Sequence, residues 1–591
     1  MTSAYTEAYS DLAVRTYDDT SGAHPGGCGC PVCSGQVQVV EDPSVYPEPQ
    51  AYLNADQREG AFISGKTSFT VERAALQLTG YNQTATGMTP QPGWGGAAGR
   101  AFTVSYGFRA DAPGAMPDDT AGFERFNMAQ INQAELALRA WADVANITFV
   151  RVGSGNAGET AYTNNAAILF GNYTSGAEGA SAFAYYPGST TASSRAGDIW
   201  VNTSLGYNAS PTSGNYGGQT LVHEIGHAIG LAHPGTYNAD ADTTFTWAND
   251  AEYYEDSRQY TVMSYFSERN TGANYGGAYS AVPLLDDVYA AQLEYGINWT
   301  TRTGATTYGF NSNAERPWFG ATSSASKLIF AVWDAGGTDT FDFSGFFQSQ
   351  VIDLREGAFS NVGGLVGNVA VAMKTVIENA IGGTGADSIV GNAANNSIFG
   401  GQGGDSIVGG EGSNFLRGDD GADTLVGGSQ FDDLHGNKGN DTLRGGGEGD
   451  WVVGGQDNDL LFGEDGGDVV LGNIGSDTLD GGSGNDVVRG GQQDDVVRGG
   501  DGADWVSGDL GFDTLTGGAG ADIFHFFNAA GSDRVTDFNA AEGDRVNLLA
   551  GTTYTVAQAG LDVVVTTGAG AQLTLEGVQL SSLTGGWIFV G

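Results

Sequence analysis

Residues 382–408 read GGTGADSIV-GNAANNSIF-GGQGGDSIV, and this nine-residue pattern continues without insertion or deletion as far as His525. Sixteen units fit the pattern. The first position is Gly in every unit, the sixth is Asp in all but two (Asn396 and Asn414), and the eighth is always apolar. A flexible Gly-rich linker would not keep an apolar residue at one fixed position, so the period indicates a stacked repeat architecture.

Each unit predicts a turn followed by a short strand. The six residues GGxGxD form a turn that glycine permits, and the last three place one apolar side chain inward. Two units would complete one coil of a parallel β-roll, whose turn carbonyls and carboxylates suit Ca²⁺. Without calcium the rows of aspartate repel one another, so we expect the roll to be unfolded or loose until calcium binds. The carboxylates assigned to calcium here are Asp387, Asp405, Asp423, Asp432, Asp441, Asp450, Asp459, Asp468, Asp477, Asp486, Asp495, Asp504 and Asp513.

The composition of the whole chain follows from this stretch. Glycine supplies 96 of 591 residues, and the net charge is −45. The repeats hold 26 acidic and 5 basic side chains, and so contribute −21 of that charge. Such an acidic chain is unsuited to binding nucleic acid. No apolar run approaches the ~20 residues of a membrane span.

A second motif, HEIGHAIGLAH at 223–233, carries the candidate chemistry. His223 and His227 are four residues apart on an expected helix, so they share a face. Gly230 lies where a helix commonly ends in a left-handed residue, which lets His233 turn back toward the first two. Three neutral imidazoles form a tripod for Zn²⁺, and Glu224 is placed to take a proton from water held by the metal.

The zinc motif and the sequence MSY at 263–265 resemble those of the metzincin zinc endopeptidases. Together with the RTX-type repeats they make the chain similar to the serralysins, secreted bacterial metalloproteases. The resemblance runs from about residue 66 to the C-terminus and includes PLLDDVYAAQLEYG at 283–296.

This resemblance implies roles for further residues. Met263 matches the Met-turn residue that packs beneath the metal. Tyr265 matches a tyrosine that can ligate zinc in the resting enzyme and then stabilise the oxyanion. Residues 182–186 (AFAYY) match the rim along which an extended substrate binds. Calcium sites outside the repeats are implied at Arg302, Gly304, Thr306, Asp334, Gly336, Gly337, Asp339 and Glu378, although Ala305 stands where family members often have an acidic residue.

The expected fold class is α+β. A metzincin-type catalytic domain, with a mixed twisted sheet and long helices, precedes an all-β domain with a right-handed parallel β-roll and a flanking β-sandwich. The domains are predicted as a propeptide-like segment at 1–58, a catalytic domain at 59–301 and a calcium-binding domain at 302–591, with RTX nonapeptides at 382–525 and a C-terminal secretion signal.

The N-terminal segment contains all three cysteines, in HPGGCGCPVC at 24–33. In one interpretation Cys28, Cys30 and Cys33 are inert thiols of a cleavable propeptide. In another, one thiolate reaches the catalytic zinc and keeps a zymogen latent. A third is a small metal site that also uses His24, although CxCxxC is not a standard zinc-knuckle spacing.

The predicted function is that of a secreted zinc-dependent endopeptidase with one catalytic Zn²⁺ and several structural Ca²⁺ ions. The alternative is a calcium-dependent adhesin or surface-layer component with a vestigial protease domain. The resemblance implies extracellular export by the type I route, which is consistent with the absence of a visible Sec signal peptide. The expected partners are protein or peptide substrates, a type I secretion transporter and a proteinaceous inhibitor, and the expected state is a monomer.

Overall fold

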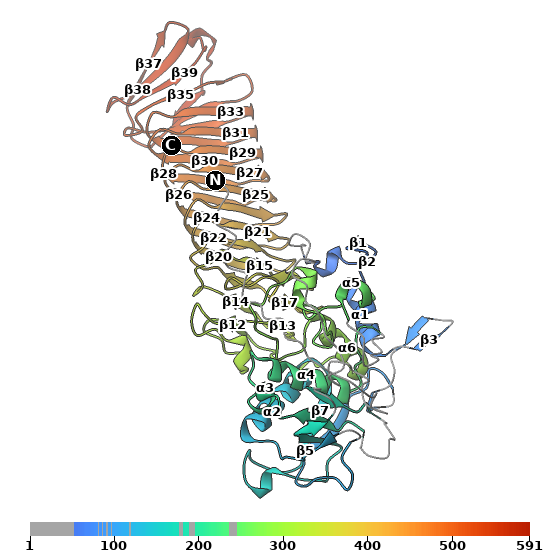
Figure 1. Ribbon diagram of the computed structural model, residues 1–591. Coiled ribbons are helices and arrows are strands. Elements are labelled where there is room, and N and C mark those ends of the chain that lie inside the picture. Colours follow the sequence, from blue (N-terminus) through green and yellow to red (C-terminus); the bar gives the residue numbers. More distant parts are fainter. Residues whose placement is uncertain are drawn as a thin grey trace, which may run out of the picture.

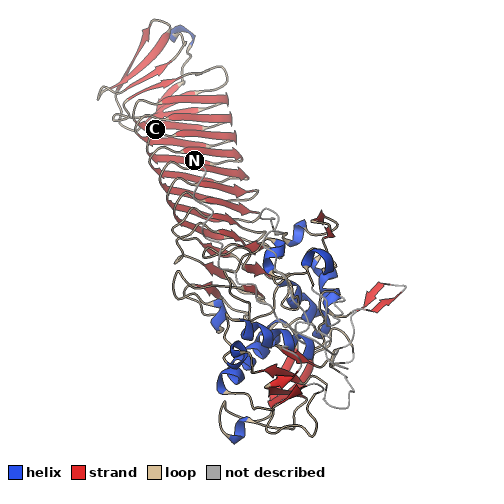
Figure 2. Ribbon diagram, in the orientation of Figure 1, coloured by secondary structure: helices blue, strands red, loops and turns tan. Residues whose placement is uncertain are grey.

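The computed structural model describes residues 52–591, except for positions 81, 85–86, 90–92, 96, 118–119, 177–180, 188–195 and 236–244. Within these residues the chain forms a unit of helices and sheet, followed by a long roll of short parallel strands (Figure 1). Figure 2 shows that the longer helices belong to the first unit. The α+β class predicted from the sequence is confirmed.

The first unit contains the α-helices of the described chain. They are α1 (Val71–Leu78), α2 (Met128–Val144), α3 (Gly206–Ala209), α4 (Tyr216–Ala228), α5 (Trp247–Asp250) and α6 (Leu285–Tyr295). Short strand pairs accompany them: β1 (Phe62–Ile63) with β2 (Lys66–Thr67), β3 (Asn82–Thr84) with β4 (Gly87–Thr89), and β6 (Thr120–Ala121) with β9 (Ser175–Gly176). No helix among the described residues is both long and apolar enough for a membrane crossing.

A five-stranded mixed sheet supports these helices. Its order is β10 (Ala182–Ala184), β11 (Ile199–Asn202), β8 (Ile168–Tyr173), β5 (Phe102–Phe108) and β7 (Ile147–Arg151). All neighbours pair in parallel except β10, an edge strand antiparallel to β11. Helices α2 and α4 begin at asparagine caps, where the side chain of Asn127 accepts from Gln130 N and that of Asn215 from Gly218 N, both at 3.0 Å.

The roll consists of two mainly parallel sheets of thirteen strands each, in a part of the chain that is described throughout. The first sheet runs through β12 (Thr307–Gly309), β14 (Thr340–Asp342), β18 (Asn379–Ile381), β20 (Ser397–Gln402), β22 (Phe415–Asp420), β24 (Asp433–Lys438), β26 (Trp451–Gln456), β28 (Val469–Ile474), β30 (Val487–Gln492), β32 (Trp505–Leu510), β34 (Ile523–Phe526), β36 (Arg545–Leu548) and β40 (Ile588–Val590).

The second sheet runs through β15 (Val351–Asp353), β19 (Ser388–Val390), β21 (Ser406–Gly410), β23 (Thr424–Gly428), β25 (Thr442–Gly447), β27 (Leu460–Asp465), β29 (Thr478–Gly484), β31 (Val496–Gly502), β33 (Thr514–Gly520), β35 (Ser532–Val535), β39 (Gln572–Leu575), β38 (Asp562–Thr567) and β37 (Tyr554–Ala559). A small sheet of β13 (Phe330–Val332), β17 (Val369–Val371) and β16 (Phe359–Ser360) lies at the start of the roll.

The interior of the roll is the row of apolar residues at the eighth repeat position. Ile407, Leu425 and Leu443 lie 18 residues apart on neighbouring strands, and each is 0% exposed. Two nine-residue units therefore make one coil, as the sequence predicted. The core is one side chain deep from each sheet, so it is thin for its length.

The strands after the repeats extend both sheets of the roll. β34 pairs with β36 and β33 with β35, both in parallel, and β37–β39 add an antiparallel edge. The flanking sandwich predicted from the sequence thus shares its sheets with the roll.

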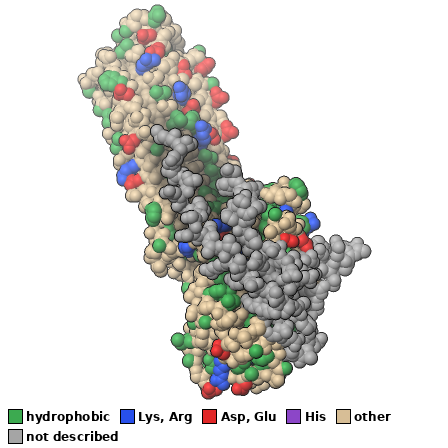
Figure 3. Space-filling view, viewed as in Figure 1, with side chains coloured by type: hydrophobic (Ala, Val, Ile, Leu, Met, Phe, Trp, Pro, Cys, Tyr) green, Lys and Arg blue, Asp and Glu red, His purple; other side chains and the backbone are tan. Residues whose placement is uncertain are grey.

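Most of the repeat aspartates are hidden inside the roll. The sixth-position aspartates are at most 3% exposed. On the visible face of the roll, Figure 3 shows acidic and basic side chains interspersed. The large negative charge of the repeats is therefore mainly internal, where it needs compensation.

Residues 52–58 lie against both units. The Arg58 guanidinium is buried and makes a two-pronged contact with Asp286 at 2.8 and 2.9 Å. Tyr260 donates its hydroxyl to the Leu53 carbonyl and accepts from Leu53 N. The Asn54 side chain accepts from Phe359 N, at the start of the roll. This segment therefore ties the catalytic unit to the roll.

Candidate metal centres and active site

The three histidines of the motif converge as predicted. The Nε2 atom of His227 lies 3.0 Å from those of His223 and His233, and the latter two are 3.3 Å apart. Nitrogen ligands about 2.0–2.1 Å from a tetrahedral Zn²⁺ would lie about 3.3–3.4 Å from one another. All three imidazoles are buried, so the set fits zinc.

Backbone carbonyls fix the orientation of two of these rings. His223 Nδ1 donates to Val262 O at 2.8 Å, and His227 Nδ1 donates to Leu231 O at 2.7 Å. Because a carbonyl only accepts, Nδ1 carries the proton and Nε2 is left unprotonated for a metal. Burial lowers the pKa of His223 to about 4, which keeps the ring neutral.

Glu224 lies beside the tripod on α4 and is 1% exposed. Its Oε2 atom has no hydrogen-bond partner among the described residues. Burial raises the pKa of this carboxyl well above its usual range, which makes the ionised group a stronger proton acceptor. An orphaned carboxylate oxygen in a dry site is what a proton-transfer group requires.

A pocket opens onto this centre and is lined by His223, Glu224 and Tyr265, with Ser181, Gln219 and Arg258 among the other wall residues. The Tyr265 hydroxyl is 2.8 Å from His233 Nε2. The predicted tyrosine is therefore next to the tripod, within reach of a group bound there.

Met263, assigned by the resemblance to the Met-turn, packs against α4. It is fully buried, and a Cβ atom on Gly226 would lie 2.6 Å from its sulfur. Gly226 stands between the first two histidines, so its missing side chain lets the methionine approach the helix.

The predicted substrate rim is the edge strand β10. Among the described strands it pairs with β11, and Tyr186, two residues after it, has its ring 5.5 Å from that of His227. A strand at the edge of a sheet beside the tripod is the kind of element along which an extended peptide can bind.

The acidic residues expected to bind calcium outside the repeats also converge. Asp339 Oδ1 accepts from Thr306 N, and Glu378 accepts from Asp339 N, both at 2.7 Å. Asp339 Oδ2 has no partner among the described residues. Burial and the charge of Asp334 raise the pKa of Asp339 to about 7. This cluster fits a hard cation.

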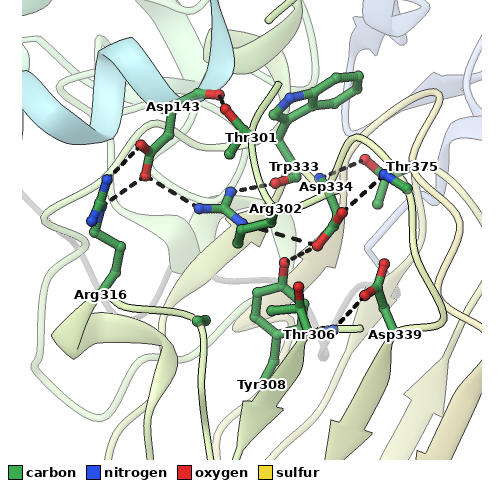
Figure 4. A network of polar contacts seen from close by, with 12 residues as sticks. Asp143, Thr301, Arg302, Thr306, Tyr308, Arg316, Trp333, Asp334, Asp339 and Thr375 are labelled. Carbon is green, nitrogen blue, oxygen red and sulfur yellow. Dashed lines mark hydrogen bonds and ion pairs between the residues drawn. The ribbon is translucent and has the colours of Figure 1, made fainter. Parts of the chain in front are cut away.

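The side chain of Arg302 has a role that sequence reasoning missed. It was predicted only for its carbonyl, yet Figure 4 shows its guanidinium between Asp143 and Asp334. The distances are 3.2 Å to Asp143 Oδ2 and 4.0 Å to Asp334 Oδ2. Arg316 contacts the same Asp143 carboxylate at 2.8 and 2.9 Å. The C-terminal end of α2 is thereby joined to the calcium cluster.

The repeat aspartates form two ladders, one on each side of the roll. From Asp387 to Asp504, the backbone N–H of each donates to Oδ1 of the aspartate 18 residues later, as from Asp441 to Asp459 at 2.9 Å. The other oxygen, Oδ2, is buried without a partner in the described chain at Asp405, Asp423, Asp432, Asp441, Asp450, Asp459, Asp468, Asp477, Asp486, Asp495, Asp504, Asp513, Asp522 and Asp533. Rows of orphaned carboxylate oxygens fit Ca²⁺.

Asn414 shows where these oxygens point. Its Oδ1 takes the ladder position, and its Nδ2 donates to the turn carbonyl of Gly412 at 3.1 Å. Where an aspartate stands in place of Asn414, its Oδ2 atom would face that carbonyl oxygen. Two acceptors cannot hydrogen-bond to each other, so a cation between them would stabilise the pair. Asp387 differs, because Gly383 N donates to its Oδ2 at 2.6 Å. The structure therefore satisfies Asp387 without calcium.

Other residues important to the sites were not identified from the sequence. Asp287 on α6 holds the segment before Met263, accepting from Thr261 Oγ1 and Val262 N at 2.5 and 2.8 Å. Asp522 is the sixth residue of the last unit and could have been named. Asp533 follows a break in the period. The predictions for Cys28, Cys30 and Cys33 lie outside the described residues.

Comparisons with known proteins agree with this arrangement. Residues 122–256 match a family model described as Matrixin, and residues 297–444 one described as Peptidase M10 serralysin C terminal. Models of the RTX calcium-binding nonapeptide repeat match segments between 435 and 526.

Several curated relatives cover most of the chain's described length. Metallopeptidase AprA of Pseudomonas marginalis is 46% identical over 61% of this chain and 74% of its own. Metalloprotease AprA of Pseudomonas entomophila (strain L48) is 45% identical over 60% and 70%, respectively. Serralysin C of Dickeya chrysanthemi is 47% identical over 57% and 67%.

The fold and the histidine tripod define a metzincin-type metalloprotease that carries RTX calcium-binding repeats. The chain belongs to the serralysin family. Its cofactors are zinc in the protease domain and calcium in the repeats, and the adhesin alternative is not favoured.

Proposed function

We propose that this chain hydrolyses internal peptide bonds at a zinc ion held by His223, His227 and His233, with Glu224 as the general base. The observation that carries the proposal is the convergence of three buried Nε2 atoms beside an orphaned carboxylate oxygen of Glu224. Zinc, when bound, supplies Lewis acidity toward the scissile carbonyl and toward water.

The protein's own groups manage the protons and the developing charge. Glu224 takes the proton of the attacking water and passes it to the leaving amine. Tyr265 would be a further ligand of bound zinc in the resting enzyme, and its hydroxyl would donate a hydrogen bond to the oxyanion. Met263 is a packing platform under the tripod and does not touch the reacting atoms.

The substrate lies extended along β10. Its backbone adds a strand to the edge of the five-stranded sheet, near residues 182–186, and its scissile bond faces the tripod. Hydrogen bonds to a peptide backbone do not depend on its side chains, so many sequences could bind in this way. We therefore expect the substrates to be extracellular proteins and peptides.

Calcium supports the second half of the chain. One site uses Asp334, Asp339 and Glu378 with backbone groups of Arg302, Gly304, Thr306, Gly336 and Gly337. The other sites use the repeat aspartates whose Oδ2 atom has no hydrogen-bond partner in the described chain. Asp387 was predicted as a ligand, but its Oδ2 accepts from Gly383 N, so we leave it out of the proposed calcium sites.

The calcium-binding domain is assigned to 302–591, and the catalytic domain, predicted at 59–301, is extended to begin at Tyr52. The removable N-terminal segment is shortened to end before Tyr52, because Arg58 and Leu53 contact the folded body. Zymogen latency through a cysteine thiolate stays a prediction.

Export to the extracellular space by the type I route follows from the family. Repeats that fold only at extracellular calcium would suit passage of an unfolded chain. A type I transporter and a proteinaceous inhibitor are the partners proposed on the same ground, and the enzyme acts as a monomer.

Glu224→Gln tests the proposed base. The amide keeps the shape but cannot accept the proton, so turnover should fall by about 10²- to 10⁴-fold. Zinc content and melting temperature should stay at wild-type values. Glu411→Gln, an exposed position on the roll, is the matched control. Casein hydrolysis by the Glu224 variant above a few per cent of wild type would rule out this role.

A further inference from the structure

We propose that the roll holds one more calcium ion than its nonapeptides define, at a terminal site formed by Asp513 and Asp533. The inference extends the proposed calcium role of the repeats to a turn that carries a two-residue insertion. Asp533 lies beyond His525, where the nine-residue pattern ends.

The first support is the continuity of the ladder. Asp495 N donates to Asp513 Oδ1 at 2.9 Å, and Asp513 N in turn donates to Asp533 Oδ1 at 3.2 Å, across 20 residues in place of 18. Gly531 faces Gly511 as successive turn glycines do in the repeats. A Cβ on Gly531 would lie 1.9 Å from Gly511 O, and one on Gly439, at the equivalent position of a repeat turn, would lie 1.5 Å from Gly421 O.

The second support is a pair of unsatisfied oxygens. Asp513 and Asp533 are 0% and 2% exposed, and Oδ2 of each has no hydrogen-bond partner in the described chain. Asp513 Oδ2 also lies over the first glycine of its turn, Gly508, as Asp495 Oδ2 lies over Gly490. The Oδ2 atoms of the terminal pair are thus buried and without a described partner, as those of the internal turns are.

The charges nearby leave these carboxylates in need of a cation. Burial raises the pKa of Asp533 to about 8, and the negative charge of Asp513 is the second cause of this rise. Arg534 follows Asp533 in the chain but points to the surface and pairs with Glu576 at 3.2 Å. Two buried carboxylates facing one another are stable only with a bound cation or a proton.

The other ladder ends differently and provides a contrast. Asp522 N donates to Asp544 Oδ1 at 3.1 Å, but Asp544 Oδ2 accepts from Asn539 N at 2.7 Å. Asp544 resembles Asp387 at the opposite end, where backbone donors satisfy both carboxylate oxygens. The unpartnered oxygen of Asp533 therefore favours a cation there, whereas Asp544 has backbone donors for both oxygens.

The site would fasten the end of the chain to the roll. Asp533 lies on β35, which pairs with β33 of the repeats and with β39 of the terminal hairpin. A calcium ion between Asp513 and Asp533 would join the last repeat turn to the strands that follow it.

The test compares three single substitutions in the full-length chain, with bound calcium counted by atomic emission after equilibrium dialysis at millimolar calcium. Asp533→Asn should bind one ion fewer than wild type, and Asp544→Asn, the matched control, should bind the wild-type number. Asp459→Asn, inside the repeats, should also lose calcium. An unchanged count in Asp533→Asn alone would refute the terminal site, whereas unchanged counts in all three would refute the calcium role of the repeats.

A measurement on the unaltered protein covers the case in which Asp533→Asn does not fold. Crystals soaked in terbium should show an anomalous peak about 2.3–2.6 Å from Asp533 Oδ2, the range for a calcium-type ligand. Peaks along the repeats with none at Asp533 would overturn the inference.

Discussion

Gly226 illustrates how a single missing side chain can shape a metal centre. It lies in α4 between His223 and His227, and a Cβ atom there would be 2.6 Å from Met263 Sδ and 3.2 Å from the Trp141 ring. The absence of a side chain at Gly226 lets α4 pack closely against Met263. The positions of both histidines therefore depend on it.

Gly226→Ala is expected to destabilise the catalytic unit by about 1–3 kcal/mol, because an added methyl group overpacks a close-packed site. The displaced helix should also weaken zinc binding. Urea unfolding gives the first quantity, and competition with a chelator of known affinity gives the second.

A double-mutant cycle separates the clash from any loss of helix geometry. Met263→Ala alone leaves a cavity and should cost about 2–5 kcal/mol. In Gly226→Ala/Met263→Ala the new methyl group has room, so the combined cost should be less than the sum. Strict additivity would show that Gly226 and Met263 do not interact as described.

For single residues, sequence spacing predicted the site only where neighbouring positions of one element fix the geometry. The i, i+4 positions of His223 and His227 and the turn at Gly230, which has φ +110°, could be predicted from the helix period. Asp287 could not, because it contacts Thr261 and Val262 from a helix more than twenty residues later. No short pattern records such a tertiary contact.

Among the elements, the strands of the roll were the most predictable from the sequence, because each repeats the same nine-residue pattern. The period located the inward residues and the calcium-facing turns. It stopped at His525, although the ladders continue to Asp533 and Asp544 across insertions of two and four residues. The signal that survives is the ending G-x-D of Gly531–Asp533 and G-D of Gly543–Asp544.

The pH response of the calcium-free roll follows from its buried carboxyls. Burial raises the pKa of Asp459 from 3.8 to about 8, and that of Asp423 and Asp477 to about 6. A carboxyl with a raised pKa in the folded state stabilises the fold below about pH 4 and loses that effect as the pH rises through 6–8. Acidification from pH 8 to pH 5 should therefore increase the β-structure of chelator-treated protein, seen by circular dichroism.

Calcium-loaded protein provides the comparison. The ion holds these carboxyls in their charged form, so acidification should release calcium and should not add β-structure. A calcium-free roll that loses β-structure between pH 8 and pH 5 would contradict the proposed burial of unpaired carboxylates.

For the whole molecule, the junction between the two units is the feature that joins calcium to catalysis. Arg302 and Arg316 both donate hydrogen bonds to the Asp143 carboxylate at the end of α2, and Arg302 also lies next to Asp334 of the calcium cluster (Figure 4). Two residues before Asp143, Trp141 Nε1 donates to Val222 O on α4 at 3.1 Å, next to His223. A continuous set of contacts thus runs from the calcium cluster to the zinc helix.

Asp143→Ala should disrupt this junction. Both guanidiniums would lose a carboxylate in a place where Arg302 is only 10% exposed, and removing one partner of a buried pair costs about 3–5 kcal/mol. Calorimetry with saturating calcium should show a lower melting temperature for the catalytic unit, and hydrogen exchange should be faster along α2. Lys438→Ala is the control, since its pair with Asp420 is 59% and 49% exposed on the two sides and such pairs contribute about 0–1 kcal/mol. In wild type, calcium removal should accelerate exchange in α2, whereas in Asp143→Ala it should add little. Equal responses of the two proteins to calcium removal would show that the coupling does not pass through Asp143.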